Sequence, residues 1–251
     1  PYTLKAILSA RGPWRAVMDH SAGSTFRQWA ELKSLPKLTI TDSEQSNYNQ
    51  IFNILPHEPY FLDENCMPST RALALTPSQV NDLGYKSLFA YQHAIATRCS
   101  LLLVSDYFEW MKTAGVYDNT KIIVVSDHGI IGPVLDRSSR AERGDTIKNL
   151  YVQSRSVLFV KDRDAHGDLN ISEQFMPNAE VPRIVCQEIG GCVNPFLENK
   201  TIDTHGRDDP FIVTKVPWQF NQQKPKAFKV NKKFEVSNRD PYKLENWKEV
   251  K

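Results

Sequence analysis

The stretch KIIVVSDHG, at residues 121–129, decides our interpretation of the fold. Four consecutive β-branched residues at 122–125 end at a polar cluster followed by Gly129. A continuous apolar run of this kind is typical of a central parallel strand that is buried on both faces. In open α/β sheets the ligand crevice lies outside the carboxyl ends of the strands. Asp127 and His128 are therefore expected where a binding site would form.

Further elements on both sides of this run support the same fold class. Leucine, tyrosine and isoleucine recur at spacings of three and four over 87–112, which predicts a long helix. A second apolar run at 156–162 and a helical pattern at 181–189 follow. Earlier in the chain, a short apolar run at 51–55, stopped by Pro56 and Pro59, predicts a buried strand that feeds a loop. We predict an α/β domain whose central sheet is largely parallel and flanked by helices.

The ends of the chain predict less regular structure. Residues 24–33 look helical, with Ser24 as the N-cap and Pro36 marking the exit. Short alternating segments at 211–236 predict a hairpin or extended arm, and a last helix is expected to begin at Pro241.

We found no internal repeat or low-complexity segment. We therefore expect a single domain over 1–251, with residues 211–251 forming a C-terminal arm and helix. The first ten residues, PYTLKAILSA, look like a helix already under way, which indicates a portion of a longer chain.

Composition excludes some classes of function. The 251 residues are 41% hydrophobic and 24% charged, which is ordinary for a globular domain. A net charge of +2 gives no basis for nucleic-acid binding, which needs a concentrated basic surface. No apolar run approaches the roughly 20 residues that span a bilayer.

The four cysteines leave the redox compartment open. Cys186 and Cys192 flank a Gly-Gly bend that could bring their Cα atoms within bridging range. Cys66 and Cys99 could meet only through tertiary structure. Four reduced, buried thiols fit the composition equally well.

Asp127 and His128 are candidate metal ligands. A carboxylate beside an imidazole suits zinc or a similar divalent ion, and Gly129 permits close approach of backbone or ligand. The alternative is a helix-capping aspartate beside a surface histidine.

Two motifs carry a family resemblance. VYDNTKIIVVSDHG, at 116–129, follows a helix ending in YFEWMK and resembles the alkaline phosphatase and sulfatase superfamily. The similarity is greatest to its membrane-anchored phosphoethanolamine transferase, lipoteichoic acid synthase and sulfatase-like members, in which an Asp-His pair reaches the catalytic metal. FNILPHEPY, at 52–60, resembles the strand of that superfamily that ends in a substrate-facing histidine. The resemblance covers roughly 48–195. It implies metal ligation by Asp127 and His128 and a catalytic, substrate-binding role for His57.

Other residues are weaker candidates for substrate binding. Arg140, with Arg137 and Arg143, follows the metal motif and could clamp an anionic substrate, although a charged connector is usually solvated. His205 is a later loop candidate, with a surface histidine as the alternative. The lysines within 224–233 could contact anionic lipid head groups or belong to an exposed hairpin.

The chain departs from the superfamily in two respects. No strand-terminal acidic ligand and no nucleophile turn is recognisable between Pro1 and Tyr48, so these parts either lie upstream or have been lost. Ile130 stands where many relatives have glutamate.

The resemblance implies a metal-dependent phosphoryl- or sulfuryl-group hydrolase or transferase that acts on envelope glycans or lipids. Zinc is the favoured metal, with calcium or manganese also compatible. The relatives imply an extracytoplasmic, periplasmic position at the inner membrane, anchored through upstream helices. The alternative is a non-catalytic sulfatase-like domain that binds lipids or glycans as an interaction module of the cell envelope.

Overall fold

The computed structural model divides the chain into two compact units, Pro1–Lys121 and Ile122–Lys251, which we describe separately. The structure describes residues 20–69, 75–129, 146–172, 175–194, 200–201, 211–215, 230 and 232–250.

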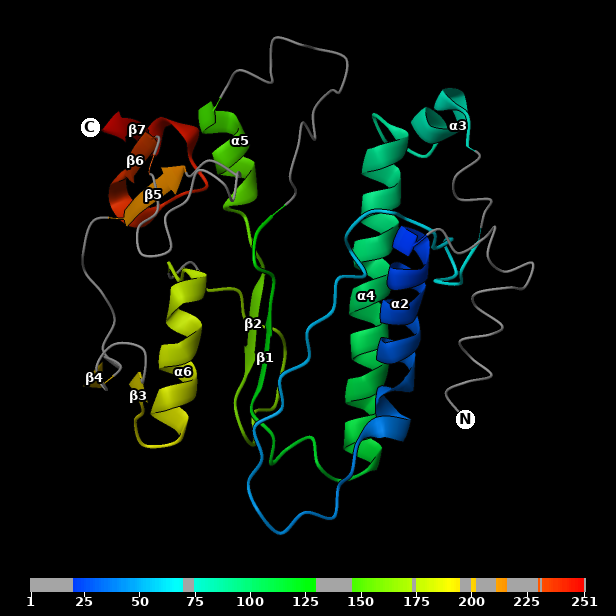
Figure 1. The fold of residues 1–251 in the computed structure, drawn as a ribbon, viewed down its shortest axis with the longest axis vertical. Coiled ribbons are helices and arrows are strands. Elements are labelled where there is room, and N and C mark those ends of the chain that lie inside the picture. The colour runs from blue at the N-terminus through cyan, green and yellow to red at the C-terminus, as the bar shows by residue number, and fades with distance from the viewer. Residues whose placement is uncertain are drawn as a thin grey trace. The chain divides into compact units, whose positions relative to one another are not determined.

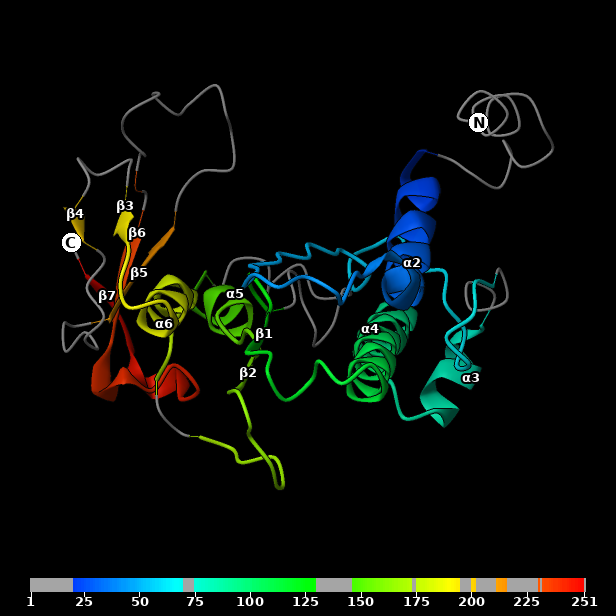
Figure 2. The same ribbon diagram turned by 90° about the horizontal axis from the view of Figure 1, so that it is seen from below.

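The first unit is built on two helices that lie side by side, α2 (His20–Leu38) and α4 (Leu88–Thr113), with the short helix α3 (Pro77–Asp82) against α4 (Figures 1 and 2). The loop between α2 and α3 contributes to the same core. The buried apolar residues of this core are Leu32, Leu55, Leu62, Val80, Tyr91, Ile95, Cys99 and Leu103.

The prediction of a long helix at 87–112 is confirmed by α4. Ser87 is its N-cap, and the Ser87 Oγ accepts a hydrogen bond of 3.1 Å from the Ala90 amide, which satisfies one of the free donors of the first turn. The helix ends before Gly115, whose φ of 72° is a conformation that glycine adopts at little steric cost.

A disulfide ties the loop between α2 and α3 to α4. Cys66 and Cys99 are bonded, with their Cα atoms 5.2 Å apart. The Trp29 Nε1 of α2 donates a 2.9 Å hydrogen bond to the Cys66 carbonyl, and the Tyr91 hydroxyl of α4 donates one of 3.0 Å to Glu64. The loop is thus fixed to both long helices.

The described residues of the second unit form three small sheets. Strand β1 (Ile122–Val125) pairs with β2 (Leu158–Lys161), and β3 (Val193–Asn194) pairs with β4 (Lys200–Thr201). Strands β5 (Phe211–Lys215), β6 (Lys232–Val236) and β7 (Trp247–Val250) form the third sheet in that order. The helices among these residues are α5 (Thr146–Gln153) and α6 (Val181–Glu188), with single 3₁₀ turns η4 (Asn178–Glu180), η6 (Ser237–Arg239) and η7 (Leu244–Asn246).

One face of the third sheet forms the core of this unit. Phe234 is fully buried, and Val236 and Trp247 beside it are nearly so. Leu150 and Tyr151, from α5, pack against this cluster. The Tyr151 hydroxyl donates a 2.8 Å hydrogen bond to the Tyr242 carbonyl, which fixes α5 to the turn before β7.

The predicted alkaline-phosphatase-like sheet, largely parallel and central, is wrong. In the part of the chain that the structure describes, no sheet has more than three strands, and every pairing is antiparallel. β1 is only partly buried, and the Val125 side chain is 40% exposed. A run of β-branched residues favours a strand of either direction, so the apolar pattern carries no information about how the strand pairs.

The predicted strand at 51–55 is also wrong, because its backbone donors are bonded to side chains. The Leu55 amide donates to Asn53 Oδ1 at 2.9 Å, and the Ile54 amide donates to Gln28 Oε1 at 3.1 Å. These bonds replace a strand ladder with a turn. Ile51 and Phe52 are exposed, whereas Leu55 is buried in the core.

Two helix predictions need correction. α2 begins before Ser24 and continues past Pro36, because its last turn is held by Thr39, whose amide and hydroxyl both donate to the Leu35 carbonyl. No α-helix begins at Pro241. The chain there forms η7 and then β7, which pairs with β6.

The predictions for two other segments agree with the structure. β5 and β6 pair antiparallel within 211–236. α6 occupies Val181–Glu188. Its Cys186 is bonded to Cys192, which follows the helix, across a bend in which Gly190 and Gly191 have φ of 78° and 112°. All four cysteines are therefore paired, which rules out the alternative of four free thiols.

We expect His93 to make the first unit sensitive to acid. Its ring lies 6.1 Å from that of Tyr60 and 6.4 Å from that of Phe89, and burial lowers its pKa below 6.5. The unfolded chain then binds the proton more readily than the folded one, so stability falls as the pH drops below about 6.5. Urea unfolding of wild type and His93→Gln at neutral pH and at pH 5 measures this. The variant should lose less stability in acid, and His57→Gln, at an exposed site, should behave as wild type. Equal losses in wild type and His93→Gln would contradict this.

Candidate functional site

Asp127 and His128 leave β1 at its carboxyl end with exposed side chains. The Asp127 carboxylate is 79% exposed and the His128 ring 41%. Asp127 Oδ1 accepts a 2.9 Å hydrogen bond from the His128 amide, and His128 Nδ1 bonds to the Gly129 carbonyl. Oδ2 of the aspartate and Nε2 of the histidine are the remaining polar atoms of the two side chains, and they lie within ion-pair distance of each other.

The separation of these two atoms suits one tetrahedral ion. Oδ2 and Nε2 are 3.6 Å apart. Zinc bonds of about 2.1 Å at a tetrahedral angle would put two ligand atoms roughly 3.4 Å apart. A carbonyl can only accept, so Nδ1 is the donor in this contact, and Nε2 is the ring atom that can bind a metal, as in histidines whose other ring nitrogen donates to a carbonyl.

An ion at this place would need further ligands. Among the residues that the structure describes, no group of three or more histidine, cysteine, aspartate or glutamate side chains could hold a metal ion. Asp127 and His128 therefore fit part of a metal site by donor chemistry and spacing, and they do not complete one.

The backbone of this turn is held by hydrogen bonds to three other segments. The Ser126 amide donates to the Val157 carbonyl at 3.0 Å, and the Val157 amide donates to Ser126 Oγ at 2.8 Å. The Gly129 amide donates to the Gln153 carbonyl at 2.6 Å, at the end of α5. The Asn178 side chain donates to the carbonyls of Ser126 and Asp127.

We expected a backbone segment or a ligand to approach Gly129 closely, and the structure shows that the backbone of Val152 and Arg155 does so. A Cβ at this position would lie 2.9 Å from the Arg155 carbonyl oxygen and closer still to that of Val152. The glycine lets the turn pack against the last residues of α5 and those that follow.

His57 lies in the first unit, in a turn after the buried Leu55. Its amide donates to the Ile54 carbonyl at 2.9 Å, and its Nδ1 is 2.7 Å from the Glu58 carbonyl oxygen. The side chain is exposed. Because His57 and the Asp127–His128 pair belong to different units, their meeting in one site stays a prediction.

Several predicted residues lie outside the described part of the chain. These are Ile130, His205 and most lysines of 224–233, together with Arg137, Arg140 and Arg143 of the segment that follows the metal motif. Lys232 is described, and its ammonium pairs with Glu249 at 2.9 Å. This lysine is therefore engaged within the sheet.

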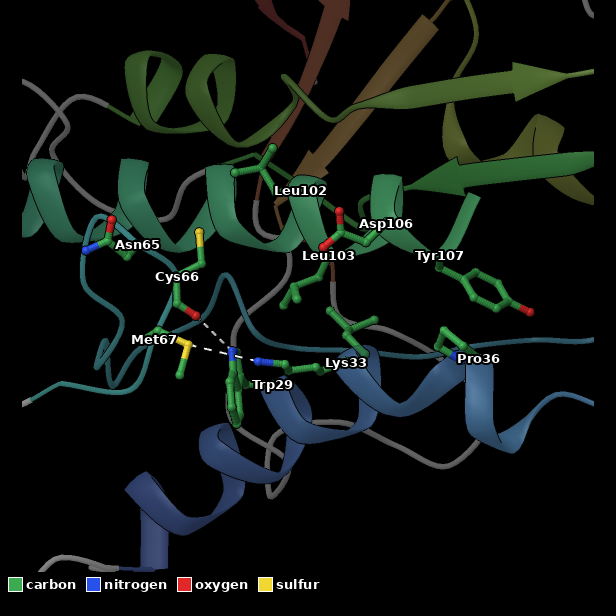
Figure 3. Close-up of a pocket in the computed structure, with 11 residues that line it drawn as sticks. Trp29, Lys33, Pro36, Asn65, Cys66, Met67, Leu102, Leu103, Asp106 and Tyr107 are labelled. Atoms are coloured by element: carbon green, nitrogen blue, oxygen red, sulfur yellow. Dashed lines mark hydrogen bonds between the residues drawn. The ribbon is translucent and has the colours of Figure 1, made fainter. Parts of the chain in front are cut away.

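A pocket of about 300 Å³ lies between α2 and α4 in the first unit (Figure 3). Its walls are mainly apolar. The Lys33 side chain reaches toward Trp29 and Met67, with its ammonium 4.0 Å from Met67 Sδ and 5.0 Å from the centre of the Trp29 ring. The predicted site residues do not line it. Its lining comprises Trp29, Leu32, Lys33, Pro36, Asn65, Cys66, Met67, Leu102, Leu103, Asp106 and Tyr107.

No protein-family model, curated protein or solved structure matches this chain. None of the helices in the described residues combines the length and apolar character needed to cross a bilayer.

Asn178 is the residue of the site that the sequence analysis missed. It lies 51 residues after Asp127, in a Pro-Asn pair just before α6. A polar residue after proline at a helix start is usually a cap, so sequence alone offered no signal of a contact with β1.

Proposed function

We propose that Asp127 and His128 bind a divalent metal ion, preferably zinc, in a protein that hydrolyses or transfers phosphoryl or sulfuryl groups of glycans or lipids. The observation that carries the proposal is the 3.6 Å spacing of Asp127 Oδ2 and His128 Nε2 at a strand end, with the other ring nitrogen bonded to a carbonyl. The motif resemblance at 116–129 and 52–60 supports it independently of the sheet topology.

The chain's own residues would have distinct tasks in such a protein. A bound metal would polarise a phosphoryl or sulfuryl oxygen as a Lewis acid. Asp127 Oδ2 and His128 Nε2 would hold it. His57 is exposed and its Nδ1 contacts the Glu58 carbonyl, so its Nε2 would bind the charged oxygens of the substrate or protonate the leaving group. Arg140 and His205 stay candidates for substrate contacts.

The disulfides support an extracytoplasmic location for this function. Two disulfides in one chain are typical of an oxidising compartment such as the periplasm. We therefore propose the periplasm as the location, with anionic glycans or lipids as the substrates within reach.

A second function, a non-catalytic envelope module, is favoured by one specific observation. Only two candidate metal donors come together among the described residues, and no nucleophile was identified in the sequence. A domain that binds lipid or glycan without turnover would need neither a complete metal set nor a nucleophile.

Zinc binding tests the proposed metal site. We expect the wild-type protein to bind about one zinc ion per chain, and Asp127→Ala and His128→Ala to weaken binding by about 100-fold or more, because each removes a direct ligand. Calorimetric titration of the metal-free protein measures this. His166→Ala and Asp168→Ala, which remove the same side-chain types from an exposed loop of the same unit, should bind as wild type does. If Asp127→Ala and His128→Ala both bind zinc as tightly as wild type does, neither residue is a zinc ligand.

Turnover separates the enzyme from the binding module. The zinc-loaded complete protein should cleave a generic phosphodiester or sulfate ester, and His57→Ala should lower that rate while keeping its zinc. Zinc binding without any turnover by the complete protein would favour the non-catalytic module.

A further inference from the structure

We infer that Asn178 is a positioning residue, whose side-chain amide sets the direction in which Asp127 and His128 leave β1. Its link to metal binding rests on the proposed function, whereas its effect on the backbone of the turn does not.

Asn178 holds two consecutive carbonyls with one nitrogen. Its Nδ2 donates to the Ser126 carbonyl at 2.8 Å and to the Asp127 carbonyl at 2.8 Å. An amide NH₂ has two protons, and both are engaged in these bonds. Since the carbonyls of neighbouring residues normally point in different directions, a shared donor fixes the Ser126–Asp127 backbone in a single conformation.

The contact begins where the strand ladder ends. The Ser126 amide still bonds to the Val157 carbonyl. In the described residues, the β1–β2 register ends at the pair Val125 and Leu158, so the next two carbonyls of this strand have no ladder partner. Asn178 satisfies both. The bond to the Ser126 carbonyl is partly buried, where an unsatisfied backbone acceptor is costly, and the bond to the Asp127 carbonyl is exposed.

Asn178 is itself held in place. Ser156 Oγ lies 3.4 Å from its Oδ1, on the side opposite the two donor contacts. Pro177 precedes it with φ of −71°, and one turn later the buried Glu180 is paired with Arg183. The amide is thus presented from a rigid start of η4 rather than from a free loop.

These contacts act on the two candidate ligands through the backbone. His128 donates its amide to Asp127 Oδ1, and its ring bonds to Gly129, so both side chains take their orientation from the local chain. A change in the Ser126–Asp127 backbone would move Oδ2 and Nε2 apart or turn them away from each other. Outer residues that orient ligands in this way typically change metal affinity by about 10- to 100-fold.

The main test variant is Asn178→Asp, which keeps the shape but replaces two donors by an oxygen that repels both carbonyls. Asn246→Ala is the matched control, since it deletes an equivalent 2.9 Å bond from an asparagine Nδ2 to the Asp240 carbonyl in the same unit. Ser156→Ala serves as a milder second variant, because it removes only the bond to Oδ1 and keeps both donors.

Two measurements decide the inference. In the metal-free protein, hydrogen exchange of the Gly129 amide, which is bonded to Gln153, should speed up about tenfold or more in Asn178→Asp and less in Ser156→Ala, and Asn246→Ala should match wild type. Zinc affinity should fall by about 10- to 100-fold in Asn178→Asp and stay unchanged in Asn246→Ala.

The outcomes separate the two proposals. Wild-type exchange at Gly129 in Asn178→Asp would overturn the positioning role, and so would an equal change in Asn246→Ala. If Asn178→Asp does not fold, Ser156→Ala decides by the same exchange measurement. Absence of zinc binding in wild type would overturn the proposed function alone, and the exchange of the metal-free protein would still decide the role of Asn178.

Discussion

Replacing Cys66 and Cys99 together by alanine should lower the free energy of unfolding of the first unit by about 4 kcal/mol. The two residues are 33 positions apart. In the chain-entropy model, closing a loop of this length restricts the unfolded chain by an amount that corresponds to about 4 kcal/mol at 25 °C. The substitution also removes a fully buried sulfur at Cys99, which adds to the loss.

Urea unfolding followed by circular dichroism measures this effect, and the second disulfide is its control. Cys186 and Cys192 are only 6 positions apart, so their replacement should cost about 2 kcal/mol by the same model, and in the other unit. Equal destabilisation by the two double variants would contradict the dependence on loop length.

The long disulfide matters for the candidate site because it holds the loop that carries His57. This loop contributes Leu55 and Leu62 to the core of the first unit, and Cys66 ties it to α4. Under reducing conditions we expect the His57 turn to lose part of this support. A function that depends on His57 would therefore suit a compartment in which disulfides persist.

The long helix α4 was predictable from the sequence because its signals are local. α4 has a capping serine and apolar residues at helical spacing, and both lie within or beside its own 26 residues. The direction of strand pairing was not predictable, because β1 and β2 are joined by a long connection, residues 126–157, whose path the apolar pattern does not specify. The strand prediction at 51–55 was wrong for a related reason. Gln28, far away in sequence, accepts a hydrogen bond from one of the backbone amides of this run.

In the candidate site, too, features set by neighbouring residues were predictable and contacts between distant residues were not. The exit of Asp127 and His128 from a strand end depends on the neighbouring residues 121–129, and it was predicted correctly although the sheet around it was not. Asn178 could not be predicted, because its two bonds to this turn exist only after η4 has been brought beside β1. The sequence predicted the two candidate ligands at the strand end, and it did not predict the tertiary contacts that hold their backbone.

Gly129→Ala should destabilise the second unit by about 1–3 kcal/mol, the usual cost of overpacking, and weaken zinc binding as well. The added Cβ would overlap the carbonyl oxygens of Val152 and Arg155. Both are backbone atoms at the end of α5 and just beyond it, so relief requires the turn or the helix end to move. Movement of the turn would break the 2.6 Å bond from the Gly129 amide to Gln153 and shift the adjacent His128.

Gly167→Ala is the control that separates overlap from backbone strain. A Cβ at Gly167 meets no atom within 4 Å, but φ there is 104°, a conformation that alanine rarely adopts. Thermal unfolding and zinc titration of both variants should show a loss of stability in each and a loss of zinc affinity only in Gly129→Ala. Zinc affinity at the wild-type level in a destabilised Gly129→Ala would mean that the turn keeps its geometry when α5 yields, and that α5 takes no part in orienting Asp127 and His128.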